Sequence, residues 1–574
     1  MQSRSRAKGL LAAAAAGAVL ALAPMGANAQ SERESLEALR QTTLALIEAL
    51  VQSGTLTRDK ADALLADAKK RADAALALTL ALAPPRPSAD PLKPEVPEVP
   101  VAPVVRVPYV PQVVRDQIRD EVREEVIARA RIERWGVPNA TAEWTDRISI
   151  EGDIRVRSQS DRPGNDNPLP EDFLAASLGG TTRAPDFAAG TATGLPNGST
   201  QDDRDRLRLR ARLGINVKVA DTVTAGLRLA TGSATDRVST NQTLGQNFNR
   251  YTFLLDRAFI KLDPTEWSTV SAGRIANPWF STDLVWSDNL NFEGVAAGFK
   301  WPATPNRTLL PFATLGYFPV REQSGPRRSR SMAGAQVGAQ WEFSELTRLK
   351  FGLAQYFYSG FTGQVDGDYD IVSGPGRSYG QYEYEAGLRQ RGNSLFLTNN
   401  PNEIAAGLTP DKARWGLGME FKPLALTAAA EFSHFAPYVV GLSAEVVRNQ
   451  GMSLEEAYQR TNGIFFNDAR AFGVGLRGTV GMQQVRNLHD WQFSMGYKWL
   501  GSDAVPDAFV DSDLGLGGTN VRGITAGLLY GLARDTQIGL RYLSGRTISS
   551  PTVNYLNKDR FAFDSLQVDL NVRF

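Results

Sequence analysis

The chain has 574 residues, of which 63 are Lys or Arg and 62 are Asp or Glu, so its formal net charge is +1. A protein dedicated to nucleic-acid binding usually shows a basic excess, so no nucleic-acid partner is expected. The absence of Cys excludes disulfides, Cys-ligated metals and thiol nucleophiles, and two His are too few for a His-rich metal site. This composition implies no metal site and no bound cofactor.

The first 29 residues have the pattern of a secretory signal peptide. Three basic residues open it, an apolar run follows over 9–22, and residues 27–29 read Ala-Asn-Ala, a small-x-small cleavage pattern. An N-terminal membrane anchor is the alternative, but the run is shorter than the roughly 20 apolar residues of a spanning helix. We therefore expect an exported protein whose mature chain begins at Gln30.

Three segments are expected before the main domain. Residues 30–83 predict a helical hairpin, because a capping box opens at Ser31 and apolar residues recur every three or four positions on both sides of Gly54. The segment 84–111 contains ten Pro in 28 residues and predicts an extended linker. A charged helix over 112–138 carries a narrow apolar stripe that self-association would bury, so we expect it to support oligomerisation.

From residue 147 to residue 574, apolar and polar residues alternate with a period of two, which indicates β-strands. Alternation also fits a soluble sandwich with its apolar side chains inward. Three features favour apolar side chains facing lipid: the signal peptide, predicted strands of about 9–13 residues, and connections that alternate between short and long. The expected fold is all-β, a 16-stranded antiparallel transmembrane β-barrel preceded by a short α-helical periplasmic region.

Sixteen strands are predicted. They lie near 147–158, 204–219, 222–232, 250–263, 267–275, 289–301, 308–318, 330–343, 347–359, 411–421, 424–436, 469–481, 489–501, 519–531, 535–546 and 560–574. With the N-terminus in the periplasm, the long loops, among them 360–410 and 437–468, all fall on the external side. Short turns such as Lys422-Pro423 fall on the other side. Fourteen or eighteen strands stay open as alternatives, because 276–288 and 482–488 are hard to place.

The end of the chain resembles the assembly signal of outer-membrane barrels, with alternating apolar residues that finish on Phe574. Further segments carry a likeness to the porins of Gram-negative bacteria: 39–44, 54–57, 107–111, 148–157 and 276–294. The chain most closely resembles the "putative porin" family with an N-terminal helical periplasmic region. That resemblance implies a homotrimer in outer-membrane lipid, inserted by the barrel-insertion machinery, that admits small hydrophilic solutes by diffusion.

A set of arginines on the first three predicted strands would face the lumen from adjacent strands. These residues, here called the arginine wall, are Arg155, Arg157, Arg204, Arg206, Arg208, Arg210, Arg212 and Arg228. Such a wall predicts an anion preference, because charged rings set selectivity in barrel channels. The alternative is that these are solvated lumen arginines without a role in selection, partly offset by Glu151 and Asp153.

The third external loop would cover 276–288 and carry Asp283 and Asp288 beside two tryptophans. In many porins of this class the third loop folds inward and narrows the pore. The two carboxylates would then face the arginine wall across the opening and orient dipolar solutes. An ordinary surface loop is the alternative. A rival constriction is 360–410, whose charged residues are Asp366, Asp368, Asp370, Arg377, Arg389 and Arg391, and calcium on loop carboxylates stays open.

Two other functions compete with a channel. A barrel enzyme would need one of the two His. Ser433 precedes His434, which we expect near the external end of its strand, but neighbours on a strand point to opposite faces. His489 is expected next to a periplasmic turn, and no GxSxG or HExxH motif occurs. We therefore expect no catalysis. A structural tether to the cell wall, built by the helices and linker of 31–134, is compatible with a pore.

Overall fold

The computed structural model describes residues 147–167, 201–302, 308–325, 327–409, 412–549 and 561–574. The chain divides into two units, Met1–Val110 and Pro111–Phe574, and every described residue belongs to the second. The expected signal peptide, helical hairpin, linker and charged helix lie outside the described residues. The tether hypothesis depends on that region, so it stays a prediction.

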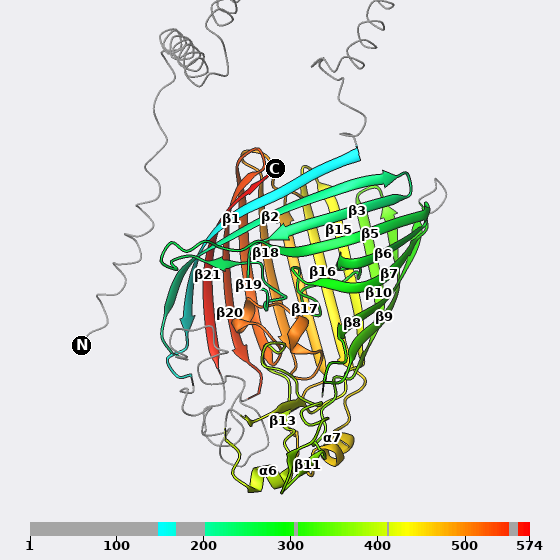
Figure 1. Ribbon diagram of the computed structural model, residues 1–574. Helices are drawn as coiled ribbons and strands as arrows, with labels where there is room; N and C mark the ends of the chain where they lie inside the picture. The colour runs from blue at the N-terminus through cyan, green and yellow to red at the C-terminus, as the bar shows by residue number, and fades with distance from the viewer. Residues whose placement is uncertain (1–146, 168–200, 303–307, 326, 410–411, 550–560) are drawn as a thin grey trace, which may run out of the picture. The chain divides into compact units, whose positions relative to one another are not determined.

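Sixteen long strands pair in chain order as antiparallel neighbours, and β21 pairs with β1 to close the sheet into a barrel (Figure 1). The predicted closed 16-stranded β-barrel is confirmed. The barrel strands are β1 (Ile148–Pro163), β2 (Arg204–Ala220), β3 (Val223–Ala230), β5 (Leu254–Thr265), β6 (Ser268–Ala276), β7 (Asn291–Lys300), β8 (Leu309–Arg321), β9 (Arg330–Ser344), β10 (Thr347–Ser359), β15 (Pro423–Phe435), β16 (Tyr438–Asn449), β17 (Phe472–Gly481), β18 (Trp491–Leu500), β19 (Val521–Ala533), β20 (Thr536–Thr547) and β21 (Ala562–Arg573).

Two errors in the predicted strands cancel, so the count is correct although one strand is misplaced. The predicted strand 411–421 is not part of the barrel, since β10 pairs directly with β15. The barrel gains instead β16, which lies inside the loop predicted over 437–468. Pro423 begins β15 rather than forming a turn, and the tight turn lies at Ala436-Pro437.

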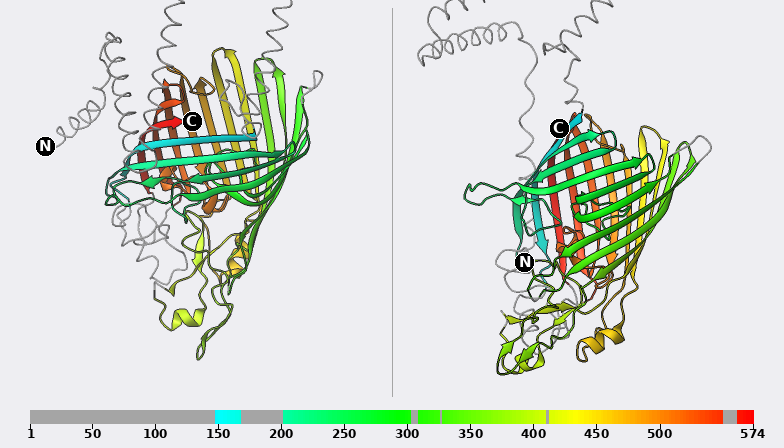
Figure 2. Two further views of the ribbon diagram at one scale, coloured as in Figure 1. Left: turned by 45° about the horizontal axis from the view of Figure 1, so that its top comes forward. Right: turned by 45° about the vertical axis from the view of Figure 1, so that its right-hand side comes forward.

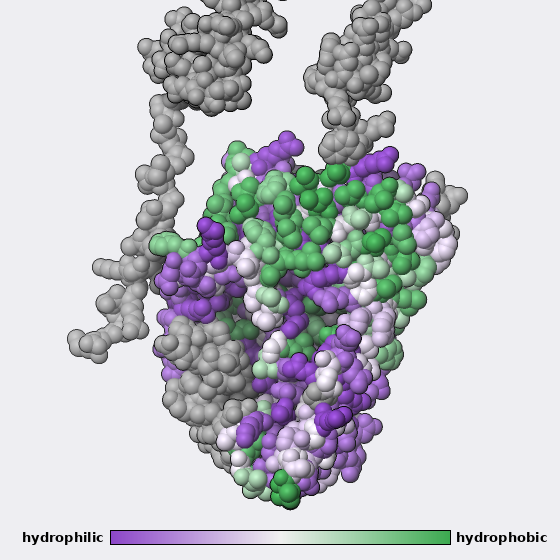
Figure 3. Space-filling model, in the orientation of Figure 1, coloured by the Kyte–Doolittle hydropathy of each residue, from purple (hydrophilic) through white to green (hydrophobic). Residues whose placement is uncertain are grey.

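The outer face of the barrel is apolar because one side of every strand carries the apolar residues. Ile154, Leu207 and Leu570 on three adjacent strands are 44%, 53% and 45% exposed, while their sequence neighbours point inward. Figure 3 shows hydrophobic residues gathered over the strands and mostly hydrophilic residues over the lower end of the molecule in that view. Side chains alternate strictly along a strand, so the apolar pattern fixes which residues line the interior.

The connections separate into two ends, which we call the short-turn end and the long-loop end. The long loops gather at one end, below the strands in Figure 1, and the two further views in Figure 2 agree. Short elements lie in these loops: β4 (Gln242–Thr243), β11 (Tyr369–Asp370), β12 (Gly374–Pro375), β13 (Leu395–Leu397), α6 (Pro401–Ala405), β14 (Trp415–Leu417), α7 (Leu454–Arg460), η4 (Asp507–Phe509) and η5 (Leu514–Leu516). Among the described residues no helix has the length and apolar character to cross a membrane.

A buried apolar core joins the long loops to the inner face of the barrel. It includes Trp286, Tyr356, Phe396, Phe421 and Phe509, which come from three different loops and from β10. These loops therefore fold on one another as a packed cap.

Candidate pore lining and constriction

The arginine wall faces the barrel interior. In the β1–β2 register, Arg155 lies opposite Arg210 and Arg157 lies opposite Arg208, while Asp161 lies opposite Arg204. Like charges directly across a strand pair destabilise a sheet unless other groups compensate them. The stability of this wall therefore depends on the carboxylates placed around it.

Carboxylates from neighbouring strands pair with most of these arginines. Arg157, only 1% exposed, donates to both carboxylate oxygens of Asp569 at 2.7 and 2.9 Å. Asp153 lies between two arginines and accepts from Arg210 at 2.7 Å and Arg212 at 2.6 Å. The remaining close pairs are Arg206–Asp161 at 2.9 Å and Arg228–Asp256 at 2.5 Å. The wall is thus a network of shared ion pairs, and Arg208 adds a 3.2 Å hydrogen bond to Gln159.

Beside this network a cavity of about 490 Å³ opens toward the short-turn end. Its lining holds more arginines than carboxylates: Arg155, Arg210, Arg212, Arg228, Arg486 and Arg573 against Glu151 and Asp153. The lining is therefore rich in arginine, although Arg228 and Arg155 also pair with Asp256 and Asp569 outside it.

The connection 277–290 between β6 and β7, here called the inward loop, runs inside the barrel. Three residues of the barrel strands hold its positions 280, 282 and 283. Gln336 on β9 both donates to and accepts from the Phe280 backbone at 2.8 Å. Lys498 on β18 donates to the Asp283 carbonyl at 2.8 Å.

The third wall residue is Glu445 on β16, a carboxylate that is 1% exposed. It accepts from the Thr282 backbone N–H at 3.0 Å and the Thr282 hydroxyl at 2.6 Å, and the Thr427 hydroxyl donates to it at 2.8 Å. No cation among the described residues forms an ion pair with it. The groups that donate hydrogen bonds to Glu445 are therefore uncharged, and they come from the inward loop and from β15.

Two tryptophans of the inward loop pack against the barrel wall. The rings of Trp279 and Trp286 each lie 5.2 Å from the Tyr356 ring on β10, in edge-on contact. Ser287 donates through its backbone N–H to the Phe509 carbonyl at 2.9 Å, which ties the inward loop to the loop 501–520. This packing holds Asp283 and Asp288 at defined positions inside the barrel.

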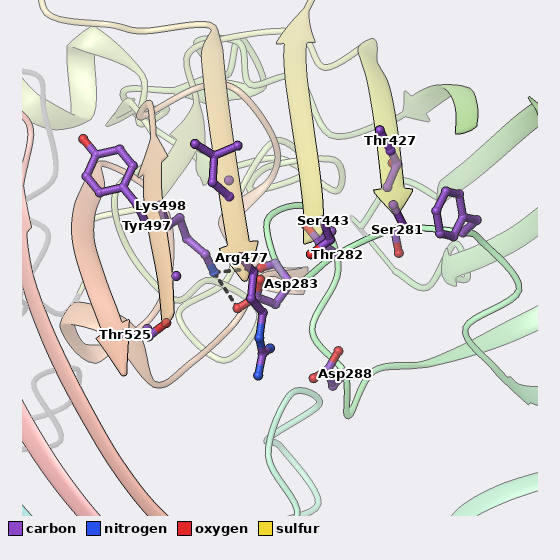
Figure 4. Close-up of a pocket in the computed structure, with 16 residues that line it drawn as sticks. Ser281, Thr282, Asp283, Asp288, Thr427, Ser443, Arg477, Tyr497, Lys498 and Thr525 are labelled. Atoms are coloured by element: carbon purple, nitrogen blue, oxygen red, sulfur yellow. Dashed lines mark hydrogen bonds and ion pairs between the residues drawn. The ribbon is translucent and has the colours of Figure 1, made fainter. Parts of the chain in front are cut away.

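The two carboxylates of the inward loop have different surroundings, as Figure 4 shows. The Asp283 carboxylate lies 3.3 Å from the Lys498 ammonium, which holds the pKa of Asp283 below its usual value. Asp288 is exposed to the lumen, and desolvation together with the nearby Asp283 charge raises the pKa of Asp288. Asp283 is thus a paired anion and Asp288 an unpaired one.

A second loop, 501–520, supplies a carboxylate that reaches the arginine wall. Asp513 pairs with Arg541 on β20 at 3.1 Å and lies 3.7 Å from Arg157. Burial alone would raise the pKa of Asp513, but the charges of Arg541 and Arg157 outweigh it and hold that pKa well below its usual range. Asp513 is therefore a loop carboxylate in direct contact with the arginine wall. That Asp283 and Asp288 face the wall across the opening stays a prediction.

Carboxylates of the rival segment 360–410 accept hydrogen bonds from the segment's own backbone. Asp366 accepts from the Gly380 backbone N–H at 2.7 Å, and Asp368 accepts from the Ser378 N–H at 2.7 Å. Arg391 donates to the Gly517 carbonyl at 2.9 Å and so ties the segment to the loop 501–520. Among the described residues no group of three or more His, Asp or Glu could hold a metal ion.

Both His lie exposed near the short-turn end. His434, expected near the external end, instead follows β15 down to the turn at Ala436-Pro437, because β15 and β16 form the hairpin that the sequence did not predict. His489 contacts the Tyr530 hydroxyl through Nδ1 at 2.6 Å. No hydrogen bond in the described part of the chain joins either His to a Ser or an Asp.

A family model described as "Putative porin" matches residues 40–574, more than nine tenths of the chain. The chain belongs to this family. It is therefore an outer-membrane channel protein, and nothing in the family description points to catalysis. No curated protein matches the chain.

Solved structures similar to this porin include OmpF of Salmonella typhi in complex with daunomycin, at 11% identity and a TM-score of 0.36 over 74% of this chain and 97% of that one. The outer membrane channel DcaP of Acinetobacter baumannii has 10% identity and a TM-score of 0.37 over 74% and 97%. An anion-selective porin from Comamonas acidovorans has 10% identity and a TM-score of 0.37 over 74% and 99%.

Phe574 ends the porin where the barrel closes. Its backbone N–H donates to the Gly152 carbonyl at 3.0 Å, and its ring lies over Gly152, where any Cβ would meet it at 2.4 Å. A larger residue at position 152 would therefore displace the Phe574 ring from β1.

Sequence reasoning missed several residues of the porin's interior. They are Asp161, Asp256, Gln336, Glu445, Arg477, Lys498, Asp511, Asp513, Arg541 and Asp569. Lys498 and Asp569 stood on the polar side of predicted strands, so the alternation could have indicated that they face the lumen. Glu445 gave no such signal because its strand was taken for a loop.

Proposed function

We propose that this porin passes small hydrophilic solutes by passive diffusion through a water-filled channel that prefers anions. The observation that carries the preference is the arginine-rich lining of the 490 Å³ cavity, where only two carboxylates face six arginines. Charge on a pore wall concentrates counter-ions in the narrow, low-dielectric surroundings of a barrel. A sixteen-stranded barrel is also wide enough to enclose water beside its inward loops.

The constriction is proposed to lie between the inward loop and the loop 501–520. Asp283 and Asp288 stand on the first loop, and Asp513 joins the second loop to the arginine wall. Solutes would therefore pass between a face with unpaired carboxylate and a face with excess arginine. That arrangement favours anions at the wall and orients solutes that carry a dipole.

We further propose that the short-turn end faces the periplasm, with the N-terminal region 30–138 on that side and the long loops outside. The barrel would work as a homotrimer in outer-membrane lipid, after removal of residues 1–29 and insertion by machinery that reads the terminal Phe574. Short periplasmic turns and long external loops are the rule for such barrels.

The test is the reversal potential of the purified full-length protein in a planar bilayer under a tenfold KCl gradient. The proposal expects stable conductance steps and a reversal potential on the side of chloride selectivity. Replacing Arg155 and Arg228 together by Gln should move that potential toward the nonselective value, whereas D221N at an exposed short turn should not. Cation preference would overturn the anion proposal, and a folded barrel without conductance would overturn the channel itself.

A further inference from the structure

A second cavity lies between the inward loop and the inner wall formed by β15–β19 (Figure 4). Its volume is about 250 Å³, which is room for a small organic solute because one water occupies about 30 Å³ of liquid. Its lining carries charges of both signs, with Asp283 and Asp288 from the loop and Arg477 and Lys498 from the wall.

Two of these four charges are already satisfied by protein groups. The Lys498 ammonium is 9% exposed and contacts the Asp283 carbonyl at 2.8 Å, the Asp283 carboxylate at 3.3 Å and Asp511 at 3.9 Å. The 2.8 Å contact is a hydrogen bond, and the two carboxylates form ion pairs with the same ammonium. Lys498 and Asp283 therefore hold the loop to the wall.

The other two charges have no partner of their own. Arg477 on β17 and Asp288 on the inward loop are both exposed to the lumen, and within the described part of the chain neither forms a hydrogen bond or an ion pair. Figure 4 shows both side chains directed to the open side of the cavity, without contact between them. The cavity thus presents one free guanidinium and one free carboxylate with a gap between.

A solute with a single charge meets both attraction and repulsion in this gap. A simple anion pairs with Arg477 but approaches Asp288 and Asp283, and a simple cation meets the reverse. A solute with both charges satisfies each group, since guanidinium binds carboxylate in a fork of two hydrogen bonds and ammonium donates to carboxylate. The two unpaired groups therefore select for opposite charges on one small molecule.

We propose that this cavity is a binding site for small zwitterions of the free α-amino-acid type, with the solute carboxylate on Arg477 and its ammonium on Asp288. The inference rests on the proposed channel function and names a solute class for it. Hydroxyls complete the site: Ser443 on β16 and Thr525 on β19 line the cavity, and their strand neighbours Leu442 and Ile524 face outward. These hydroxyls can accept or donate the remaining hydrogen bonds of the solute.

The experiment measures block of the single-channel current by three matched probes added to the full-length protein in a bilayer. The probes are L-glutamine, N-acetyl-L-glutamine, which lacks the ammonium, and L-glutaminamide, which lacks the carboxylate. We expect glutamine to reach half-block at a concentration at least about fivefold lower than either derivative, because each derivative loses a charge-assisted contact. Equal half-blocking concentrations for all three probes would overturn the proposal.

Variants locate the effect in this cavity. D288N and R477Q should each raise the half-blocking concentration of glutamine by about fivefold or more, and the conservative D288E should restore block. The matched controls D221N and R534Q change the same charges at exposed short turns and should leave block unchanged. Glutamine block that survives both D288N and R477Q would also refute the site.

The same recordings separate this inference from the proposed function. If the reversal potential in KCl keeps its anion preference while glutamine shows no preferential block, only the zwitterion site fails. If folded protein gives no conductance, the channel proposal fails. Folding of each variant is checked by its heat-dependent mobility in gel electrophoresis.

Discussion

The two walls of the lumen hold their charged groups in opposite ways. On the wall of β1–β3 and β21, carboxylates are shared, so that Asp153 serves Arg210 and Arg212, and Asp569 serves Arg157 and Arg155. On the wall of β15–β19, Glu445 binds the inward loop without an ion-pair partner, and Lys498 is the one cation among the described residues that pairs with Asp283 and Asp511. We therefore expect the first wall to tolerate the loss of one arginine, because the carboxylate that it paired with keeps a second arginine. The second wall has no second partner of this kind.

The largest effect is expected from Lys498→Met. The change leaves the Asp283 and Asp511 carboxylates without their cation. Because both carboxylates are partly exposed, we expect a cost of about 3 kcal/mol, the low end of the range for breaking a buried ion pair. Urea unfolding of the detergent-solubilised barrel, followed by tryptophan fluorescence, should show this loss. The matched control is Lys261→Met, whose partner Asp263 lies 2.9 Å away in an exposed pair, and it should cost less than about 1 kcal/mol. Equal losses in both variants would contradict the comparison.

Glu445→Ala comes next. It removes the acceptor of the Thr282 N–H and of two hydroxyls. The hydroxyls can rotate to other partners, so the main cost is the unpaired N–H, about 1–3 kcal/mol. We expect lower stability together with larger, noisier single-channel currents, because the inward loop loses its hold on β16. Glu445→Gln keeps an acceptor oxygen and should show a smaller change. Glu431→Ala, which breaks the exposed pair with Arg348 at 3.1 Å, is the control and should leave the currents quiet.

The arginine wall should respond to single changes weakly and to double changes strongly. Arg210→Gln or Arg212→Gln alone leaves Asp153 with one cation, so each should cost about 1 kcal/mol or less. The double variant leaves Asp153 unpaired, and its cost should exceed the sum of the singles by about 1–2 kcal/mol. A double-mutant cycle by urea unfolding measures this excess, and strict additivity would mean that the carboxylate is not shared.

The smallest effect is a pH dependence of selectivity. Desolvation and the Asp283 charge raise the pKa of Asp288, so this carboxyl gains its proton first as the pH falls, while Asp283 stays ionised beside Lys498. Loss of one negative charge at the constriction should increase the anion preference on acidification. Reversal potentials at neutral and mildly acidic pH measure the shift. D288N should show the acidic value at both pH values, and a pH shift that persists in it would assign the effect elsewhere.

The barrel itself could be predicted because its rule is local. Strand alternation, signal peptide and loop lengths were enough for closure and for the lumen-facing side of the arginines. The failure at 411–421 has a physical reason. Apolar residues do alternate in this segment, at Trp415, Leu417, Met419 and Phe421. Their side chains are buried in the loop cap, because an apolar face can pack against other loops as well as it packs against lipid. In β16, Val439 and Val447 on the inner face blurred the alternation.

The constriction could be predicted only in part. Its carboxylates Asp283 and Asp288 stood out in the sequence, but the residues that hold the loop lie far away in the chain. Glu445 follows its partner Thr282 by 163 positions, and Lys498 follows its partner Asp283 by 215. Such contacts depend on which strands meet across the barrel, and no local pattern carries that information. The pairing of Asp513 with the arginine wall has the same character, since a loop of the last quarter reaches the first strand.

The most direct test of the account asks whether the inward loop lies in the conducting path. The chain has no Cys, so Asp288→Cys gives a single thiol, and Asp221→Cys at a short turn gives the control. A charged methanethiosulfonate reagent is added during a single-channel recording. We predict a stepwise fall in conductance for D288C and none for D221C. Complete labelling of D288C without any change in current would show that the loop does not narrow the pore.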